Sequence, residues 1–396
     1  KMNDMKTINI TPFLLALSLL VSCSSDDDNG PEVIVPQDAT LTLAIAPGSV
    51  LTKAKAGETQ EGEAKINNMY AALFKADQTL LTSAYVDFSG QTGKTPDTIR
   101  ISAKSDTPYT YVILVNVGNI KCSSIDDLME KTYNLENISV NNQPMGSKFL
   151  EITSLKPGTN YYGKEDVFTN KPAEYSFYSK NNIEVYRTAS RIDFEKISLK
   201  WSEADAGDLL QENARFCLKQ VYVVDAKSTT YLADRKYGEN NYSVEITSDP
   251  AYLHGKPGED YLESLNLFPR EGDNTSAIIT SGKEWNITEN PLRCYITENT
   301  DKTKPTMLVL KGDILHENTD EPILSDRYYF VKLLNLIDSD NKETIYPGVI
   351  RNKVIRISAT ITGKGSGDEE YKENAYVTVT VTPENWSVET QHENVN

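Results

Sequence analysis

Histidines, cysteines and paired carboxylates build most catalytic and metal sites, so their spacing is the first guide to chemistry. The three histidines, His254, His316 and His392, lie in polar, loop-like segments, and none belongs to an HExxH motif. The sequence contains no GxSxG nucleophile motif. Acidic residues are frequent, but no pattern brings two of them together as a general acid and base. The sequence therefore predicts a protein that is not an enzyme.

Two glycine-rich or acidic segments resemble ligand loops only superficially. GKGSG, at residues 363–367, lacks the GK[ST] ending of a phosphate loop and follows a strand without opening a helix. DSDNKE, at residues 338–343, begins like a calcium loop, but Glu343 stands where that loop needs glycine and Val349 where it needs glutamate. Both segments predict turns, and no metal or other cofactor is expected.

The four cysteines are Cys23, Cys122, Cys217 and Cys294, and no two of them have CxxC spacing. Setting Cys23 aside leaves three, which cannot all pair within one chain. We expect at most one disulfide, with buried free thiols as the default.

Cys23 directly follows the apolar run PFLLALSLLVS, residues 12–22, which lysines precede. This run is too short to cross a bilayer as a stable helix, but it matches the core of a signal peptide. Residues 20–23, LVSC, resemble the lipobox of bacterial lipoproteins. That resemblance implies a signal peptide at residues 1–22 and a diacylglycerol on Cys23. The alternative is an ordinary signal peptide with a chance cysteine.

Residues 23–38 contain SSDDDNGPE, which offers no core-forming side chain, so we expect a solvated tether. Asp26, Asp27 and Asp28 are consecutive carboxylates on this tether and lack the fixed geometry of a cation site. An acidic stretch after a lipidated cysteine resembles the surface-export signal of Bacteroidota lipoproteins. It implies a location on the outer face of the outer membrane.

From Ala39 onward, apolar and polar residues alternate with the period of β-strands. Leu41, Leu43 and Ile45 give the first such run, and many short runs separated by turn residues follow. This pattern favours an all-β sandwich over βαβ units. Residues 123–135 have the serine cap and apolar spacing of a helix, whereas residues 61–74 are predicted as a short turn leading into a strand.

The bulk composition sets limits on the number of domains and on the partners. A chain of 396 residues is too long for one ordinary core, so we expect two domains, at residues 39–182 and 183–396. The formal net charge of −17 argues against nucleic acid and against an anionic membrane surface as partners.

Five blocks occur in a characteristic order along the chain: EAKINNMYAALFKADQTLL (63–81), VYRTASRIDFEKI (185–197), PLRCYITENT (291–300), IYPGVIRNKVIRISATITGKGSG (345–367) and VTVTVTPENWSV (377–388). Together they resemble the major fimbrial subunit family, the fimbrillins, of Bacteroidota type V pili. The resemblance implies two transthyretin-like β-sandwich domains with short helical insertions. It also implies a structural pilin, the stalk subunit of a fimbria that supports adhesion and biofilm formation.

The family's assembly mechanism would begin with removal of an N-terminal strand at the cell surface by a trypsin-like protease. Mapped onto this sequence, that strand carries Leu41, Leu43 and Ile45, and the cut would follow Lys53 or Lys55. The family's best-known protease requires arginine, yet no arginine lies between the cysteine at 23 and the arginine at 100. Either a lysine-tolerant protease acts or processing differs in this chain. The alternative reading is that the two lysines are exposed loop charges.

The emptied groove would then accept a strand from another copy, which gives a head-to-tail filament. The expected donor is the carboxyl tail, where Trp386 and Val388 project on one face; the alternative is that Trp386 packs into its own domain. The partners implied are other copies of the chain, tip and anchor subunits, and the outer membrane through the lipid. The alternative functions are a tip or anchor subunit, or a non-polymerising surface lipoprotein that binds glycan or host protein.

Overall fold

A computed structural model describes residues 35–47, 60, 62–89, 98–163, 165–168, 171–179, 181–233, 251–270, 276–338, 342–370 and 377–385. The chain divides into two units, Lys1–Val35 and Pro36–Asn396. All the described strands and helices belong to the second unit.

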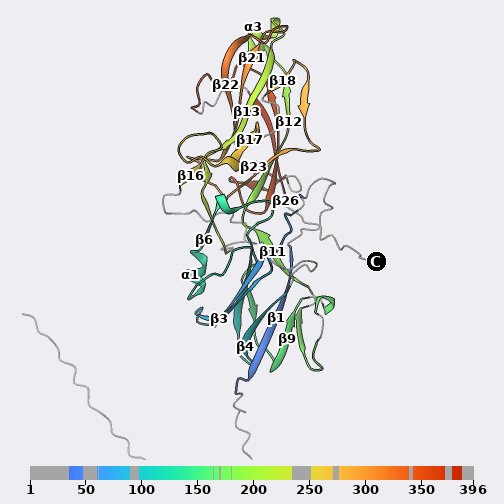
Figure 1. The fold of residues 1–396 in the computed structure, drawn as a ribbon, viewed down its shortest axis with the longest axis vertical. Helices are drawn as coiled ribbons and strands as arrows, with labels where there is room; N and C mark the ends of the chain where they lie inside the picture. Colours follow the sequence, from blue (N-terminus) through green and yellow to red (C-terminus); the bar gives the residue numbers. More distant parts are fainter. Residues whose placement is uncertain are drawn as a thin grey trace, which may run out of the picture. The chain divides into compact units, whose positions relative to one another are not determined.

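The first half of the described chain forms one ten-stranded sheet (Figure 1). Its strands run in the order β10-β9-β1-β11-β7-β5-β2-β3, while β4 pairs with β1 and β8 pairs with β5. The strands are β1 (Asp38–Pro47), β2 (Asn68–Phe74), β3 (Leu80–Asp87), β4 (Thr98–Lys104), β5 (Tyr109–Val115), β7 (Met145–Gly146), β8 (Leu150–Ile152), β9 (Gly158–Tyr162), β10 (Ser176–Ser179) and β11 (Ile183–Arg187). Alternate side chains of β1 and β4 pack on those of β2 and β5 in a single apolar cluster.

The second half forms two five-stranded sheets. One has the order β19-β12-β25-β26 with β20 beside β12, and the other has the order β17-β13-β21-β22 with β18 beside β13. The strands are β12 (Ser190–Leu199), β13 (Arg215–Val224), β17 (Asn266–Phe268), β18 (Ala277–Ile279), β19 (Glu284–Asn286), β20 (Leu292–Ile296), β21 (Met307–Leu315), β22 (Pro322–Lys332), β25 (Lys353–Ile361) and β26 (Val377–Asn385). Apolar side chains of both sheets share one large core, which is the layer arrangement of a β-sandwich.

Small elements connect these sheets. Three two-stranded pairs are β6 (Thr132–Asn134) with β15 (Thr229–Tyr231), β14 (Ala226–Lys227) with β16 (Tyr252–Leu253), and β23 (Leu336–Ile337) with β24 (Ile345–Tyr346). The α-helices are α1 (Ile125–Met129), α2 (Glu203–Ala206) and α3 (Asp208–Gln211), and the 3-10 helices are η1 (Leu135–Asn137), η2 (Glu165–Val167) and η3 (Glu263–Leu265). The predicted all-β sandwich fold with short helices is confirmed.

The turn predicted before β2 is confirmed, whereas the predicted helix is confirmed only in part. Residues 62–64 form a turn that leads into β2, as predicted. The predicted helix at residues 123–135 is shorter than expected. Ser124 caps α1, because its hydroxyl accepts the N–H of Asp127 at 3.1 Å, but the helix ends at Met129. Residues 132–134 instead pair with β15, so strand pairing overrides the helical spacing there.

Strand pairing changes sharply between β11 and β12. β11 pairs with β1 and β7, whereas β12 pairs with β19, β20 and β25. Only the residues from Thr188 to Ala189 separate the two strands. The predicted domain limits of 39–182 and 183–396 stay a prediction.

Candidate functional site

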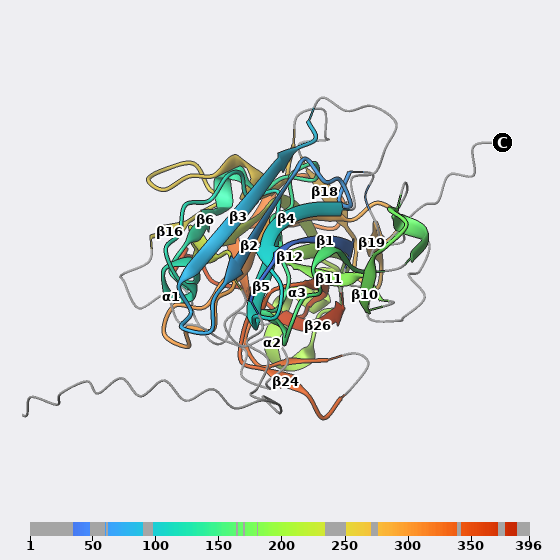
Figure 2. The same ribbon diagram turned by 90° about the horizontal axis from the view of Figure 1, so that it is seen from below.

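β1 lies in the interior of its sheet, with a hydrogen-bonded neighbour on each side. Residues 39–43 pair antiparallel with β4 and, along the other edge, parallel with β9. Residues 45–47 then continue parallel to β11. β1 lies beside β4 in both views of the ribbon (Figures 1 and 2). Taking β1 away would leave unpaired N–H and C=O groups on both walls of a groove, which is costly unless another strand or water satisfies them.

The inward face of β1 is fully apolar. The structure places Leu41, Leu43 and Ile45 in the core formed with β2, β4 and β5, where each is buried. Burying one such side chain contributes about 1.5–3 kcal/mol, so the three together contribute roughly 5–9 kcal/mol. The groove is therefore strongly apolar, and an occupant needs alternate large apolar residues.

The outward face of β1 contacts a small aromatic cluster. Ala44 is buried against Tyr161 and Phe168, whose ring centroids lie 4.5 Å apart. Gly163 allows this close approach, because a Cβ built there would lie 2.5 Å from the Cβ of Ala44. The Asn160 amide also donates to the carbonyl oxygen of residue 40 at 3.2 Å. β1 is thus packed on both of its faces.

The start of β1 is held by an exposed ion pair. Lys104 Nζ lies 2.7 Å from Asp38 Oδ1, and their side chains are 55% and 96% exposed. The hydrogen bond and positive charge of Lys104 lower the pKa of the Asp38 carboxyl. Solvent screens such a pair, so it adds little to the retention of β1.

A second cluster, which we call the Glu63 cluster, comprises Glu63, Arg187, Arg191, Asp193 and Tyr295. Its centre is the pair between Glu63 and Arg191, both 0% exposed. Arg191 Nη1 donates to both carboxylate oxygens of Glu63 at 2.8 Å. The Nε and Nη2 atoms of Arg191 donate to the two oxygens of Asp193 at 2.7 and 2.8 Å. One guanidinium therefore bridges two buried carboxylates.

The remaining members fix the turn that carries Glu63. The Tyr295 hydroxyl, from β20, donates to Glu63 Oε1 at 2.9 Å. Arg187 Nη2, from β11, donates to the backbone carbonyl oxygen of Glu63 at 3.2 Å. The Gln60 N–H donates to Glu63 Oε2 at 3.2 Å. Glu63 is thus held by side chains from β11, β12 and β20.

The charges inside this cluster shift one another's pKa values. Burial lowers the pKa of Arg187 to about 10. Burial alone would also lower the pKa of Arg191, but the carboxylates of Asp193 and Glu63 raise it above its ordinary value. Burial and the negative charge of Glu63 raise the pKa of Tyr295. Arg191 is therefore charged and the Tyr295 hydroxyl neutral at neutral pH.

Sequence reasoning did not identify this cluster. In β12, Ile192 and Phe194 face the sandwich core, so alternation assigns Arg191 and Asp193 to the solvent face. The structure buries that face under the turn at residues 62–64. The available signal was two opposite charges, Arg191 and Asp193, on the same face of one predicted strand.

The other residues predicted to act in lipidation, export, processing and strand donation lie outside the described residues: Cys23, Asp26, Asp27, Asp28, Lys53, Lys55, Trp386 and Val388. β26 ends at Asn385, directly before the predicted donor residues, and among the described strands it pairs with β25 alone.

The described cysteines form no site. Cys122, Cys217 and Cys294 are free thiols, and burial raises the pKa of Cys294 to about 12, which suppresses its thiolate. Across the described ranges, no group of three or more His, Cys, Asp or Glu side chains is placed to hold a metal ion. Nor does any helix in this part of the chain have the length and apolarity needed to cross a membrane.

Comparison with known proteins finds similarity to fimbrial subunits. Residues 39–187 match the sequence model of the family described as Major fimbrial subunit protein (FimA). A curated relative, Major fimbrium subunit FimA type-4 of Porphyromonas gingivalis, is 25% identical over 427 residues, covering 96% of this chain and 97% of its own. The Putative fimbrium tip subunit Fim1C of Parabacteroides distasonis is 25% identical over 319 residues, covering 76% and 74%.

Two solved structures share the fold. A putative cell adhesion protein from Parabacteroides distasonis has a TM-score of 0.64 at 19% identity, covering 89% of this chain and 100% of its own. A fimbrilin from Porphyromonas gingivalis has a TM-score of 0.58 at 18% identity, covering 89% and 99%. At these identities the likeness supports the fold alone.

Proposed function

Because the chain belongs to the major fimbrial subunit (fimbrillin) family of Bacteroidota, we propose that it is the stalk subunit of a type V fimbria. It is a structural protein that assembles by replacing β1 with a strand from another copy. The observation that carries this proposal is the position of β1, an interior strand at the start of the described chain, paired along both edges.

Assembly begins when a protease cuts the chain after Lys53 or Lys55. β1 then belongs to a separate fragment, and its groove opens between β4 and β9. The tail beyond β26, with Trp386 and Val388 as apolar anchors, enters the groove of the next copy. Each copy both donates and accepts a strand, so the contact is head-to-tail and extends into a filament.

Before it is cut, the precursor is a lipoprotein. Cys23 carries the lipid, and Asp26, Asp27 and Asp28 direct the chain to the outer face of the outer membrane. Cutting after Lys53 or Lys55 releases the lipidated segment, so the assembled subunit becomes part of an extracellular fimbrium.

Limited trypsin treatment tests the proposal. Purified chain should lose the residues up to Lys53 or Lys55 and then form ladders that resist SDS. A Lys53→Gln/Lys55→Gln variant, treated identically, should stay monomeric. Trimmed native chain that stays monomeric would exclude the stalk role.

A role as a tip subunit is the second candidate, favoured by the similarity to the putative tip subunit Fim1C. A tip subunit has no need to donate a strand. Deleting residues 384–396 should abolish ladder formation by a stalk subunit. Unchanged ladders would show that the donor strand lies elsewhere, and absence of ladders from the trimmed native chain would favour the tip role.

A further inference from the structure

At the end that carries Tyr222 and Val224, the sheet of β13, β21 and β22 has apolar residues on both of its faces. Its inner face belongs to the sandwich core. On its outer face, two rows of cross-strand neighbours run side by side: Tyr222–Val309–Phe330 and Val224–Met307–Lys332. The outer face of an antiparallel sheet is usually wet, yet the aromatic and aliphatic residues here form a second buried cluster. Packing into the sandwich core therefore does not explain why this outer face is apolar.

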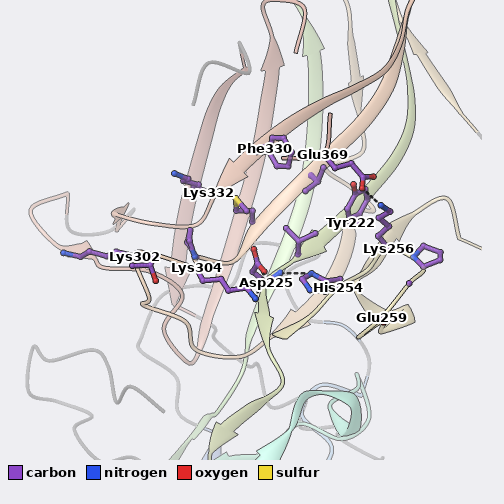
Figure 3. Close-up of a pocket in the computed structure, with 17 residues that line it drawn as sticks. Tyr222, Asp225, His254, Lys256, Glu259, Lys302, Lys304, Phe330, Lys332 and Glu369 are labelled. Carbon is purple, nitrogen blue, oxygen red and sulfur yellow. Dashed lines mark hydrogen bonds and ion pairs between the residues drawn. The ribbon is translucent and has the colours of Figure 1, made fainter. Parts of the chain in front are cut away.

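A cavity of about 580 Å³ lies over this outer face. Figure 3 shows its rim, to which three separate segments contribute lysines: Lys256, the pair Lys302 and Lys304, and Lys332. The acidic residues of the lining are Asp225, Glu259 and Glu369. Lysines thus outnumber acids by one in the cavity, although the whole chain carries a formal charge of −17. The lining thus has a formal charge of +1 on an acidic protein, with Lys256 and Lys304 each paired to an acid of the lining.

The polar groups of the rim are held in fixed positions. Lys256 forms an ion pair with Glu369, and Lys304 lies 3.6 Å from Asp225 and 3.9 Å over the ring of Tyr252. The N–H of Asp225 donates to His254 Nδ1 at 3.3 Å (Figure 3). Since Nδ1 is an acceptor, the neutral imidazole carries its proton on Nε2 and can donate a hydrogen bond from that atom.

The floor of the cavity restricts what can bind there. Backbone groups of β13, β21 and β22 pair with one another across the floor, so a peptide lying on the floor cannot add a strand between them. Recognition must come from side chains. These are an apolar floor, a lysine rim for a negative charge, and polar groups such as His254 and Glu259 that can bond hydroxyls. The cavity volume lies within the range of small-molecule sites.

We propose that this cavity binds an anionic saccharide, a sugar that carries a carboxylate or sulfate. The less polar face of the sugar ring lies on the Met307 and Phe330 side of the floor. Its negative group meets the ammonium groups of Lys256 and Lys332. The site lies on β13, β21 and β22, apart from β1 and its groove, so it gives the subunit a binding function separate from filament assembly.

Titration of the full chain with 3′-sialyllactose, a hyaluronan tetrasaccharide and a 6-sulfated N-acetyllactosamine, each followed by calorimetry, tests the proposal. At least one should bind saturably, at least 10-fold more tightly than neutral lactose, and binding should weaken with salt. A Lys256→Met/Lys332→Met variant should lose at least 10-fold in affinity. A Lys200→Met variant, which removes an exposed lysine just after β12, should bind normally.

Absence of saturable binding by all three sugars would overturn the proposal, as would equal binding of lactose or full affinity in the double variant. An acidic hexapeptide that binds more tightly than every sugar would also overturn it and assign the cavity to peptide. Matching melting temperatures of native and variant chains show that a loss of binding reflects the site and not the fold. Because filament assembly is measured separately, failure here leaves the proposed stalk role intact.

Discussion

Two segments that are close in the sequence, β1 and the turn that carries Glu63, are held in place by different kinds of interaction. β1 is retained by backbone pairing on both edges and by Leu41, Leu43 and Ile45 in an apolar core. The turn at residues 62–64 is retained by side chains that bind the carboxylate oxygens of Glu63. The predicted processing sites, Lys53 and Lys55, lie between these segments in the sequence.

The difference lies in what can replace each segment. A strand ladder and an apolar core accept any strand of suitable alternation, because backbone groups and buried area carry the interaction. A buried carboxylate facing Arg191 cannot be exchanged for an uncharged residue without breaking a buried ion pair. β1 is therefore suited to exchange, whereas the Glu63 cluster is suited to keep the new amino-terminal end in place after a cut.

The largest effect is expected from Glu63→Ala. It removes one of the two buried carboxylates that Arg191 bridges, and breaking a buried pair typically costs about 3–5 kcal/mol. Urea unfolding of the full chain measures this loss, with the exposed Glu151→Ala as the matched control. A loss below about 1 kcal/mol would mean that the cluster contributes no more than a surface ion pair.

Leu43→Ala should destabilise the uncut chain by about 2–5 kcal/mol, because it leaves a cavity in the core. The same substitution should have no effect on assembled, trimmed protein, in which β1 is absent. The effect of Glu63→Ala should persist there. If Leu43→Ala and Glu63→Ala behave alike before and after trimming, the distinction between an exchangeable and a permanent segment is wrong.

Gly163→Ala should destabilise the uncut chain by about 1–3 kcal/mol, because the added methyl group would overlap Ala44. The positive φ of Gly163, +139°, adds strain for any other residue. Combining Gly163→Ala with Ala44→Gly should restore part of the loss. Thermal melting of the two single variants and the double variant gives the coupling, and purely additive losses would show that the two residues do not meet.

The smallest effect is expected from the Asp38 ion pair. Lys104 lowers the pKa of Asp38 below its ordinary value of 3.8 in the folded chain. Its contribution is therefore present above pH 3.8 and is lost as the pH falls through the folded pKa. Comparing Asp38→Asn with the native chain from pH 7 to pH 2 should show a slight difference that vanishes in acid. A difference that grows on acidification would contradict this sign.

The sequence predicted the sandwich and the inward face of β1, because a strand with one apolar face shows its period directly. It did not predict the burial of Arg191 and Asp193, since alternation along β12 says which face they share but not what covers that face. The sequence did not predict the cavity over β13, β21 and β22 for a similar reason. Val224, Met307 and Phe330 are adjacent only through strand register, which no local pattern gives.

The central claim is that the groove left by β1 is filled by a strand from another copy. Hydrogen–deuterium exchange of β4 and β9 tests it most directly, since these strands line the groove. We predict slow exchange in the uncut chain, fast exchange in trimmed monomers lacking residues 384–396, and slow exchange again in assembled trimmed protein. Exchange of β4 and β9 that stays fast in the assembled protein would contradict the account.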